Sequence, residues 1–157
     1  MKIKLLIFFV ILINYKSVSQ IVNIPDVNFQ QYLINNIEIN TTNDGEIQNS
    51  EAFDFTGEIS IAYQTITSLT GLEAFTNLTS LSLYSCDLNS INITSNTNLL
   101  KLDVSKNNLN VLNISEHTNL EELTFSENNI TSLDVSLHIS LTSIIGAKNA
   151  LTSLNLS

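Results

Sequence analysis

The chain has few cationic side chains, a single cysteine and no tryptophan. Six basic residues stand against fifteen acidic ones, which gives a formal net charge of −9 at pH 7. An acidic surface repels nucleic acid and anionic lipid, so we expect neither as a partner. Because Cys86 is the only cysteine, no intramolecular disulfide can form and stability must come from a packed core. The length of 157 residues favours a single domain.

The sequence also lacks the short motifs of several enzyme classes. No G-x-S-x-G, H-E-x-x-H, Walker or dinucleotide-binding fingerprint occurs. His117 and His138 occupy equivalent places in a repeat, preceded by Asn96, but the pattern offers no third metal ligand beside them. We therefore expect both histidines at a turning position, and we predict a protein that is not an enzyme.

The first part of the chain, residues 1–19, has the layout of a secretory signal peptide. Lys2 and Lys4 precede an apolar run from Leu5 to Ile13, and small residues follow near Ser19. The run is too short to span a bilayer, and a buried N-terminal strand or helix is the alternative. Removal of this segment would leave three lysines and a formal charge of −12. The remaining sequence has no second apolar stretch long enough for membrane insertion. This predicts a secreted or cell-surface protein.

A pattern with a period of 21 residues begins at Leu78. Each unit contains two half-units of the form L-x-x-L-x-L, in which apolar and polar residues alternate as in a half-buried strand. One unit cannot bury its own apolar face, so successive units must stack as coils. An earlier, less regular coil fits residues 58–66. The sequence thus predicts a repeat solenoid of parallel strands with about five coils over residues 58–157. Its first column is formed by Leu78, Leu99, Leu120 and Leu141.

This pattern resembles the leucine-rich-repeat family, whose motif is L-x-x-L-x-L-x-x-N-x-L. Asn107, Asn128 and Asn149 hold the asparagine position, and Cys86 takes it in the first unit. The resemblance implies that these side chains form an internal hydrogen-bonded ladder along the solenoid. The nested 21-residue form is similar to a bacterial subclass of exported repeat proteins. The resemblance is specific for fold and leaves the function open.

Residues 20–57 are predicted to cap the first coil, whose apolar end would otherwise be exposed. An amphipathic helix is expected from Pro25 to Ile37, with Asp26 near its start, where the helix dipole favours an acid. After the first coil, apolar residues recur every third position from Leu69 to Leu78 and indicate a 3₁₀-like turn. The cap helix is expected to face inward through Val27, Phe29, Leu33 and Ile34.

Residues 40–51 resemble the twelve-residue calcium loop of the EF-hand. Gly45 falls at the sharp turn, Ile47 at the apolar anchor and Glu51 at the place of the bidentate carboxylate. The loop departs from the motif because positions one and three lack carboxylates. Calcium binding and a metal-free turn of the same geometry both remain open, and any bound ion would stabilise the cap. The candidate ligands are Asn40, Thr42, Asp44, Glu46 and Glu51.

The outward positions beside the strand leucines form the candidate ligand-binding surface. We expect ion pairs between neighbouring coils here, with Lys101 beside Glu122 and a column formed by Lys106, Glu127 and Lys148. Tyr84 is expected to be the one exposed aromatic on this face, where it would anchor a ligand. The candidate residues are Tyr84, Lys101, Asp103, Lys106, Glu122, Thr124 and Glu127.

The sequence therefore predicts a secreted or cell-surface module that recognises an extracellular protein or glycan without catalysis. An alternative follows from residues 154–157, which stop inside a coil. In that case the chain would be a truncated targeting or spacer arm of a larger exported protein, an enzyme or an adhesin, whose C-terminal domain is missing.

Overall fold

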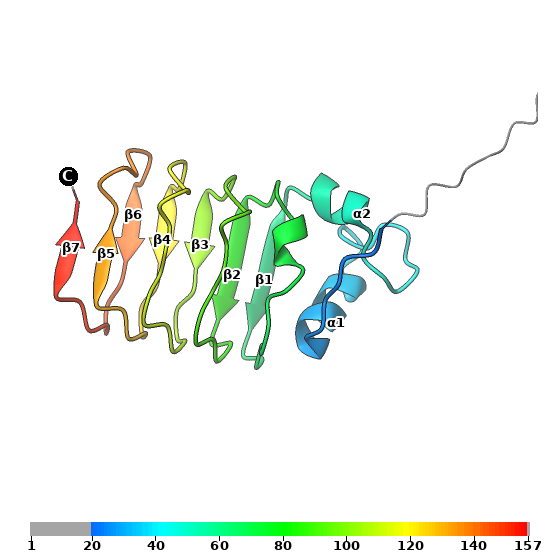
Figure 1. Ribbon diagram of the computed structural model, residues 1–157, viewed down its shortest axis with the longest axis horizontal. Helices are drawn as coiled ribbons and strands as arrows, with labels where there is room; N and C mark the ends of the chain where they lie inside the picture. Colours follow the sequence, from blue (N-terminus) through cyan, green and yellow to red (C-terminus); the bar gives the residue numbers. More distant parts are fainter. Residues whose placement is uncertain (1–19, 157) are drawn as a thin grey trace, which may run out of the picture.

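The computed structural model describes residues 20–156, so the predicted signal peptide lies outside the described residues. Two helices stand at one end of a row of short strands, and the C-terminal residues lie at the other end (Figure 1). None of the helices in the described part is long and apolar enough to cross a membrane. The elements in chain order are α1 (Val27–Asn35), α2 (Asn49–Asp54), β1 (Glu58–Ala62), η1 (Leu72–Ala74), β2 (Ser80–Tyr84), β3 (Lys101–Asp103), β4 (Glu122–Thr124), β5 (Ser132–Asp134), β6 (Ser143–Ile145) and β7 (Ser153–Asn155).

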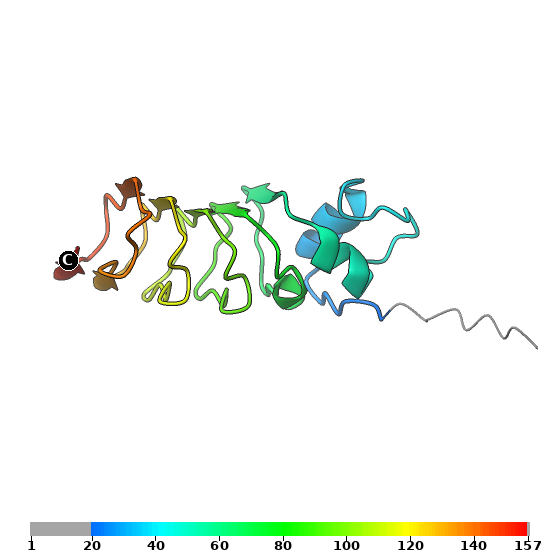
Figure 2. The same ribbon diagram turned by 90° about the horizontal axis from the view of Figure 1, so that it is seen from above.

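Parallel strands from successive coils form the main sheet, in the order β1-β2-β3-β4-β6. From β2 onward, paired residues are 21 positions apart, as in Ser80 with Lys101 and Lys101 with Glu122, whereas Glu58 pairs with Ser80 across 22. A second sheet contains only β5 and β7 and lies on the other side of the coils (Figure 2). The prediction of a parallel β solenoid with about five coils is therefore confirmed. The second half-unit forms paired strands only in the last two coils.

The alternation of apolar and polar residues sets which side chains enter the core. In the main sheet Leu81, Leu102 and Leu123 lie in register and are buried, whereas Ser82 and Asp103 face outward between the core positions. Burial of one leucine stabilises the fold by about 1.5 to 3 kcal/mol, so each column gains from every coil that is added. The 3₁₀ turn expected near Leu72 is present as η1.

The asparagine ladder runs inside the solenoid at the position predicted for it. The Asn107 side-chain oxygen accepts hydrogen bonds from the backbone N–H groups of Cys86 and Leu88, both at 3.0 Å. Its amide nitrogen donates to the carbonyls of Leu83 and Val104 at 2.7 and 2.9 Å. Asn107 therefore links two coils, and Asn128 repeats this arrangement one coil further on.

Cys86 occupies the ladder position of the earlier coil. Its thiol is buried and donates to the Ile61 carbonyl at 3.4 Å. Burial raises the pKa of Cys86 above its usual value, so the thiol stays protonated at neutral pH. This is the structural role that the resemblance implied for Cys86.

A second ladder lies at another corner of the coils. The Asn96 side chain donates to the carbonyls of Leu72 and Phe75 at 2.9 Å. His117 Nε2 lies 3.0 Å from the Ile93 carbonyl, and His138 Nε2 lies 3.0 Å from the Ile114 carbonyl. Both histidines are buried. They therefore hold successive coils together at the turning position, as expected.

Gly146 departs from the apolar column that contains Leu83, Val104 and Phe125. A Cβ atom at Gly146 would overlap the ring of Phe125, which is fully buried in the coil before it. The large phenylalanine therefore occupies the space that a fourth apolar side chain would need. The large side chain of Phe125 and the missing side chain of Gly146 together fill the core space of the two coils, although each departs from the usual size in this column.

This arrangement predicts that the effects of two substitutions are not additive. Gly146→Val should lower the free energy of unfolding by about 2 kcal/mol, because the new side chain collides with the ring. Adding Phe125→Val should recover about 1 kcal/mol or more, although Phe125→Val is destabilising alone. Urea unfolding of the four proteins in this cycle measures the coupling, and strictly additive effects would contradict the packing described.

The cap differs from its prediction in two respects. Phe29 and Leu33 are buried as expected and Ile34 packs partly against the core, but Val27 is exposed and points away from it. Val27 is the first residue of α1, directly after the N-cap, so it lies outside the apolar stripe. The helix α2 was not identified from the sequence, because its six residues are too few to show a helical period.

Asp26 joins the cap to the first coil. One carboxylate oxygen accepts the Phe29 N–H at 2.9 Å and caps α1, and the other accepts the N–H and the hydroxyl of Thr67, both at 2.7 Å. Burial by itself would raise the pKa of Asp26, but these hydrogen bonds outweigh it and the net pKa is lowered.

Candidate functional site

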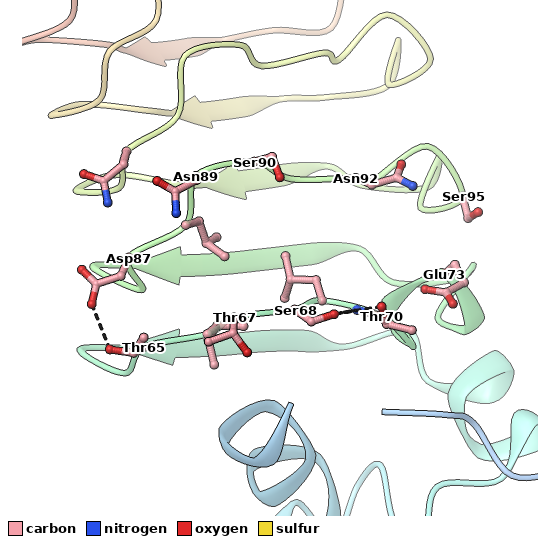
Figure 3. Close-up of a pocket in the computed structure, with 14 residues that line it drawn as sticks. Thr65, Thr67, Ser68, Thr70, Glu73, Asp87, Asn89, Ser90, Asn92 and Ser95 are labelled. Carbon is pink, nitrogen blue, oxygen red and sulfur yellow. Dashed lines mark hydrogen bonds between the residues drawn. The ribbon is translucent and has the colours of Figure 1, made fainter. Parts of the chain in front are cut away.

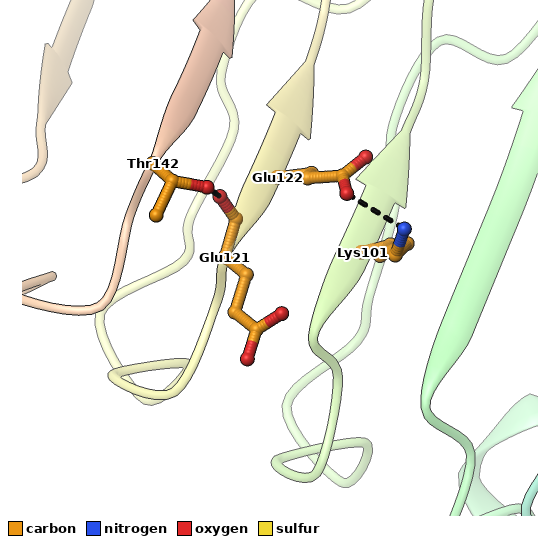
Figure 4. Close-up of polar contacts among 4 residues, drawn as sticks. All are labelled: Lys101, Glu121, Glu122 and Thr142. Carbon is orange, nitrogen blue, oxygen red and sulfur yellow. Dashed lines mark hydrogen bonds and ion pairs between the residues drawn. The ribbon is translucent and has the colours of Figure 1, made fainter.

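The outward face of the main sheet carries two of the expected ion pairs, whereas the expected pair between Lys106 and Glu127 is not formed. Lys101 Nζ lies 2.6 Å from Glu122 Oε1 on the neighbouring strand (Figure 4). Lys148 Nζ lies 3.2 Å from Glu127 Oε1. Glu121, which precedes Glu122 in the chain, does not join the ion pair between Lys101 and Glu122. Its side chain points away from Lys101 in Figure 4, and its backbone carbonyl accepts the Thr142 hydroxyl at 3.1 Å. Both pairs are solvent-exposed, so they contribute little to the stability of the fold. Their main effect is to hold the charged groups in fixed positions on this face.

An aromatic corner lies at the carboxyl end of β1 and β2. Tyr84 is only half-buried, and the ring of Tyr63 lies 5.3 Å from it with an interplanar angle of 74°. Tyr63 is 75% exposed, so the expectation that Tyr84 would be the one exposed aromatic is wrong. We define the aromatic corner as Tyr63, Tyr84 and Lys106.

Lys106 belongs to this corner by a cation–π contact. Its Nζ lies 5.1 Å from the centroid of the Tyr84 ring. Hydrogen bonding to Tyr84, followed by the charges of Tyr84 and Glu127, raises the pKa of Lys106. No carboxylate of the described residues forms an ion pair with Lys106, whereas Lys101 and Lys148 are both paired. Lys106 is thus the cation of this face that remains available to a ligand.

The backbone conformation explains why Tyr63, Lys106 and the residues in equivalent places project from the edge of the main sheet. Five residues that follow the strands of the main sheet have positive φ, between 54° and 58°: Tyr63 and Ser85 come directly after β1 and β2, and Lys106, Glu127 and Lys148 come three residues after β3, β4 and β6. This left-handed conformation ends each strand and turns the chain into the next segment. The repeated turn places four long side chains along the carboxyl edge of the sheet.

Asp103 and Thr124 are less available than the exposed charged candidates Lys101, Lys106, Glu122 and Glu127. Both are partly buried between neighbouring strands. Asp103 Oδ1 accepts the Ser105 N–H at 2.9 Å, so this carboxylate closes a turn at the end of β3. The structure therefore brings Tyr84 and Lys106 together and pairs Lys101 with Glu122, while Asp103 serves the turn.

The loop at residues 40–51 gathers oxygen atoms around one hydroxyl. Thr42 Oγ1 lies 3.5 Å from Asn40 Oδ1, 3.2 Å from Gln48 Oε1 and 3.0 Å from Glu51 Oε1. One hydroxyl proton can satisfy one of these acceptors, so the loop holds more acceptors than this donor can serve. Such a surplus fits a hard cation, which takes carboxylate, amide and hydroxyl oxygens together. Gln48, at position nine of the loop, was not among the residues selected from the sequence.

Glu51 is the best-held carboxylate of the loop. It is buried, and it accepts the Thr42 N–H at 2.9 Å and the Gln48 N–H at 3.0 Å, with a further bond from the Thr41 hydroxyl. Burial would raise the pKa of Glu51, but the hydrogen bonds lower it on balance, so the group is charged at neutral pH. Asp44 instead accepts from the Glu46 N–H and the Gln48 amide, and Asn40 donates to the Ile34 carbonyl.

Two of the solved structures that are similar to this chain come from Listeria monocytogenes. The functional domain of InlJ from Listeria monocytogenes, described as including a cysteine ladder, has 33% sequence identity and a TM-score of 0.65. It matches over 68% of this chain and 24% of its own length. The internalin InlF from Listeria monocytogenes has 20% identity and a TM-score of 0.66, over 81% of this chain and 44% of its own. The second likeness concerns the fold alone, and the chain spans less than half the length of either structure.

No curated protein matches the chain. The family model described as the leucine-rich-repeat domain of endo-beta-N-acetylglucosaminidase EndoS matches residues 24–149, which cover most of the described residues. Together with the stacked coils and the asparagine ladder, this match shows that the chain belongs to that family of leucine-rich-repeat domains.

Proposed function

We propose that the protein is an exported, non-catalytic recognition module that binds an extracellular protein through the outward face of its main sheet. The observation that carries this proposal is the aromatic corner. The exposed Tyr63 and the half-buried Tyr84, beside a lysine that forms no ion pair, offer both apolar contact area and directional polar contacts. Tyrosines of this kind dominate the energetics of many protein interfaces. Export is supported by the charge and apolar pattern of residues 1–19.

The charges of the face favour a partner with a defined arrangement of groups. Lys101 and Lys148 are already paired with glutamates, so Lys106 is free to meet a carboxylate of the partner. Ser60 and Ser82 are small outward residues of neighbouring strands and let a partner approach the backbone beside Tyr84. The partner surface would therefore bring an acidic group to Lys106 and an apolar or aromatic group to Tyr63.

Binding to a panel of purified extracellular protein domains tests this function. For a partner that binds, Tyr63→Ala and Tyr84→Ala should each weaken the affinity about tenfold or more, as measured by calorimetry. Val111→Ala, an exposed position away from the main sheet, is the matched control and should leave the affinity unchanged. If the chain is only a spacer or targeting arm, the two tyrosine variants will keep every interaction of the unchanged protein.

We propose a second, structural function for the loop at residues 40–51, the binding of Ca²⁺. The convergence of Asn40, Gln48 and Glu51 oxygens on Thr42 supports it. With Asp44 and the backbone carbonyl of Glu46, these residues would hold the ion. The ion would supply a positive charge that fixes the loop between α1 and α2, which the loop joins.

Thermal melting of the purified protein with calcium and with a chelator tests this site. Calcium at about one hundred times its dissociation constant would stabilise the fold by about 2.7 kcal/mol. Glu51→Gln should abolish the calcium-dependent rise in Tm, because it removes the charged bidentate ligand. Glu46→Gln is the matched control, since position seven binds through its backbone carbonyl. An unchanged Tm in calcium for the original protein would exclude the site.

A further inference from the structure

A groove lies on the return segments of the first two coils, apart from the strands of the main sheet. It is formed by residues 65–70 and 87–95 and has a volume of about 990 Å³. Figure 3 shows these two segments running side by side, with Thr65 and Asp87 at one end and Glu73 and Ser95 at the other. This size is at the upper end of the range for sites that hold small molecules.

The lining of the groove is polar almost throughout. Except for Ile66, Leu69 and Leu88, every lining residue has a hydroxyl, amide or carboxylate side chain. No lysine or histidine lines it. Sites for drug-like ligands are mainly apolar, so this lining suits a ligand whose surface is itself rich in hydrogen-bonding groups.

Several of these polar groups are not used by the fold. The side chains of Asn89, Ser90, Ser95 and Asn108 are exposed and form no hydrogen bond with another described residue. Each hydroxyl and amide can both donate and accept, so a ligand that does the same can pair with all of them. These groups are available without breaking any contact that holds the coils together.

The two carboxylates of the groove are each only partly engaged. Asp87 Oδ2 accepts the Thr65 hydroxyl at 2.9 Å, and Glu73 Oε2 accepts the Gly71 N–H at 2.8 Å. In each case the second oxygen faces no recorded donor among the described residues and can accept from a ligand hydroxyl. Carboxylates without a neighbouring cation repel anions, which excludes phosphate, sulfate and uronic acids. The described residues contain no group of three acidic, histidine or cysteine side chains that could hold a metal here.

From this chemistry we infer that the groove binds a neutral oligosaccharide, with its hydroxyl groups paired to Asn89, Ser90 and the two carboxylates. An uncharged chain of sugars offers many hydroxyls that donate and accept, and it carries no charge for Asp87 and Glu73 to repel. The site is separate from the sheet face, so one module can hold a glycan and a protein at the same time.

NMR titration of the purified, isotope-labelled protein tests this inference. The probes are hexasaccharides of β-1,4-glucose, β-1,3-glucose, α-1,6-mannose and β-1,4-N-acetylglucosamine, with hexagalacturonic acid as the charged comparison. At least one neutral probe should shift the backbone amides of Thr67, Asn89 and Ser90 saturably at millimolar concentration. Hexagalacturonic acid should not.

Variants separate the groove from the sheet face. Asn89→Leu and Asn108→Leu should each raise the Kd for the bound sugar about tenfold, while Lys101→Ala leaves it unchanged. Asn89 and Asn108 are both exposed, so leucine at either position should not disturb the core. Unchanged NMR signals from the rest of the protein show that each variant is folded. The inference is overturned if no neutral probe shifts these amides, if the acidic probe binds as tightly, or if the shifts centre on Tyr63 and Tyr84.

Discussion

Replacing Asn107 with alanine is expected to lower the free energy of unfolding by about 3 to 4 kcal/mol. The substitution leaves the buried N–H groups of Cys86 and Leu88 without an acceptor and the carbonyls of Leu83 and Val104 without this donor. A buried polar group that loses its partner costs about 1 to 3 kcal/mol, and here both neighbouring coils are affected. Equilibrium unfolding in urea measures the change.

The neighbouring asparagine provides the control for this prediction. Asn108 is exposed and its side chain makes no hydrogen bond to another described residue, so Asn108→Ala should change stability by less than about 0.5 kcal/mol. Asn107→Cys should lie between the two, because Cys86 shows that a thiol at this position donates to a carbonyl of the coil before it. Equal effects at Asn107 and Asn108 would refute the role assigned to the ladder.

Asp26→Ala is expected to cost about 3 kcal/mol and to release the cap from the first coil. The change removes the N-cap of α1 and the two hydrogen bonds from Thr67 together. Asp26→Asn separates the two effects, since its amide oxygen can still accept the Phe29 N–H while its NH₂ group opposes the Thr67 donors. Hydrogen exchange of the Phe29 and Leu33 amides should be faster in both variants, and most in the alanine variant. Asp54→Ala, at the exposed end of α2, should leave these rates unchanged.

The lowered pKa of Asp26 also gives a pH dependence with a definite sign. A carboxyl whose pKa is lower in the folded state stabilises the fold above its unfolded pKa, and the stabilisation is lost as the pH falls through the folded value. The stability contributed by Asp26 should therefore be complete at neutral pH and decline below its ordinary value of 3.8. Asp26→Asn should show a smaller loss of stability than the original protein over this acidic range. Identical acid transitions would argue against the link to Thr67.

The fold could be predicted because the residues that determine it recur with a fixed period of 21 in the sequence. The spacing of Leu81, Leu102 and Leu123 shows which residues pair between neighbouring strands, and the same spacing places Lys101 beside Glu122. Asparagine at one turn position, with Cys86 as its substitute, is a pattern that few other architectures produce. These features depend on local alternation and a fixed period, both of which are visible in one sequence.

Features that depend on departures from the period were missed. β1 pairs with β2 across 22 residues rather than 21, so Ala62 lies opposite Tyr84 in the sheet and Tyr63 follows the end of β1. The alignment started at Leu78, and the contact between Tyr63 and Tyr84 was therefore not anticipated. The predicted pairing of Lys106 with Glu127 was wrong, because Glu127 pairs with Lys148 and the Lys106 ammonium lies over the Tyr84 ring. The polar groove between residues 65–70 and 87–95 has no sequence signal, since its hydroxyl and amide residues resemble those of any exposed turn.

The constant register of the later coils has a consequence for how such a protein can change over generations. Recombination that adds or removes one 21-residue unit among β2, β3, β4 and β6 keeps every apolar column and both ladders in phase. The distance from the helical cap to the far end would change by about 4.8 Å with each unit, while the pairing rules stay the same. Span is therefore a trait that a single genetic event can adjust in discrete steps. The corner formed by Tyr63, Tyr84 and Lys106 would be kept unaltered when the unit gained or lost lies beyond Lys106, in the coils of β4 and β6.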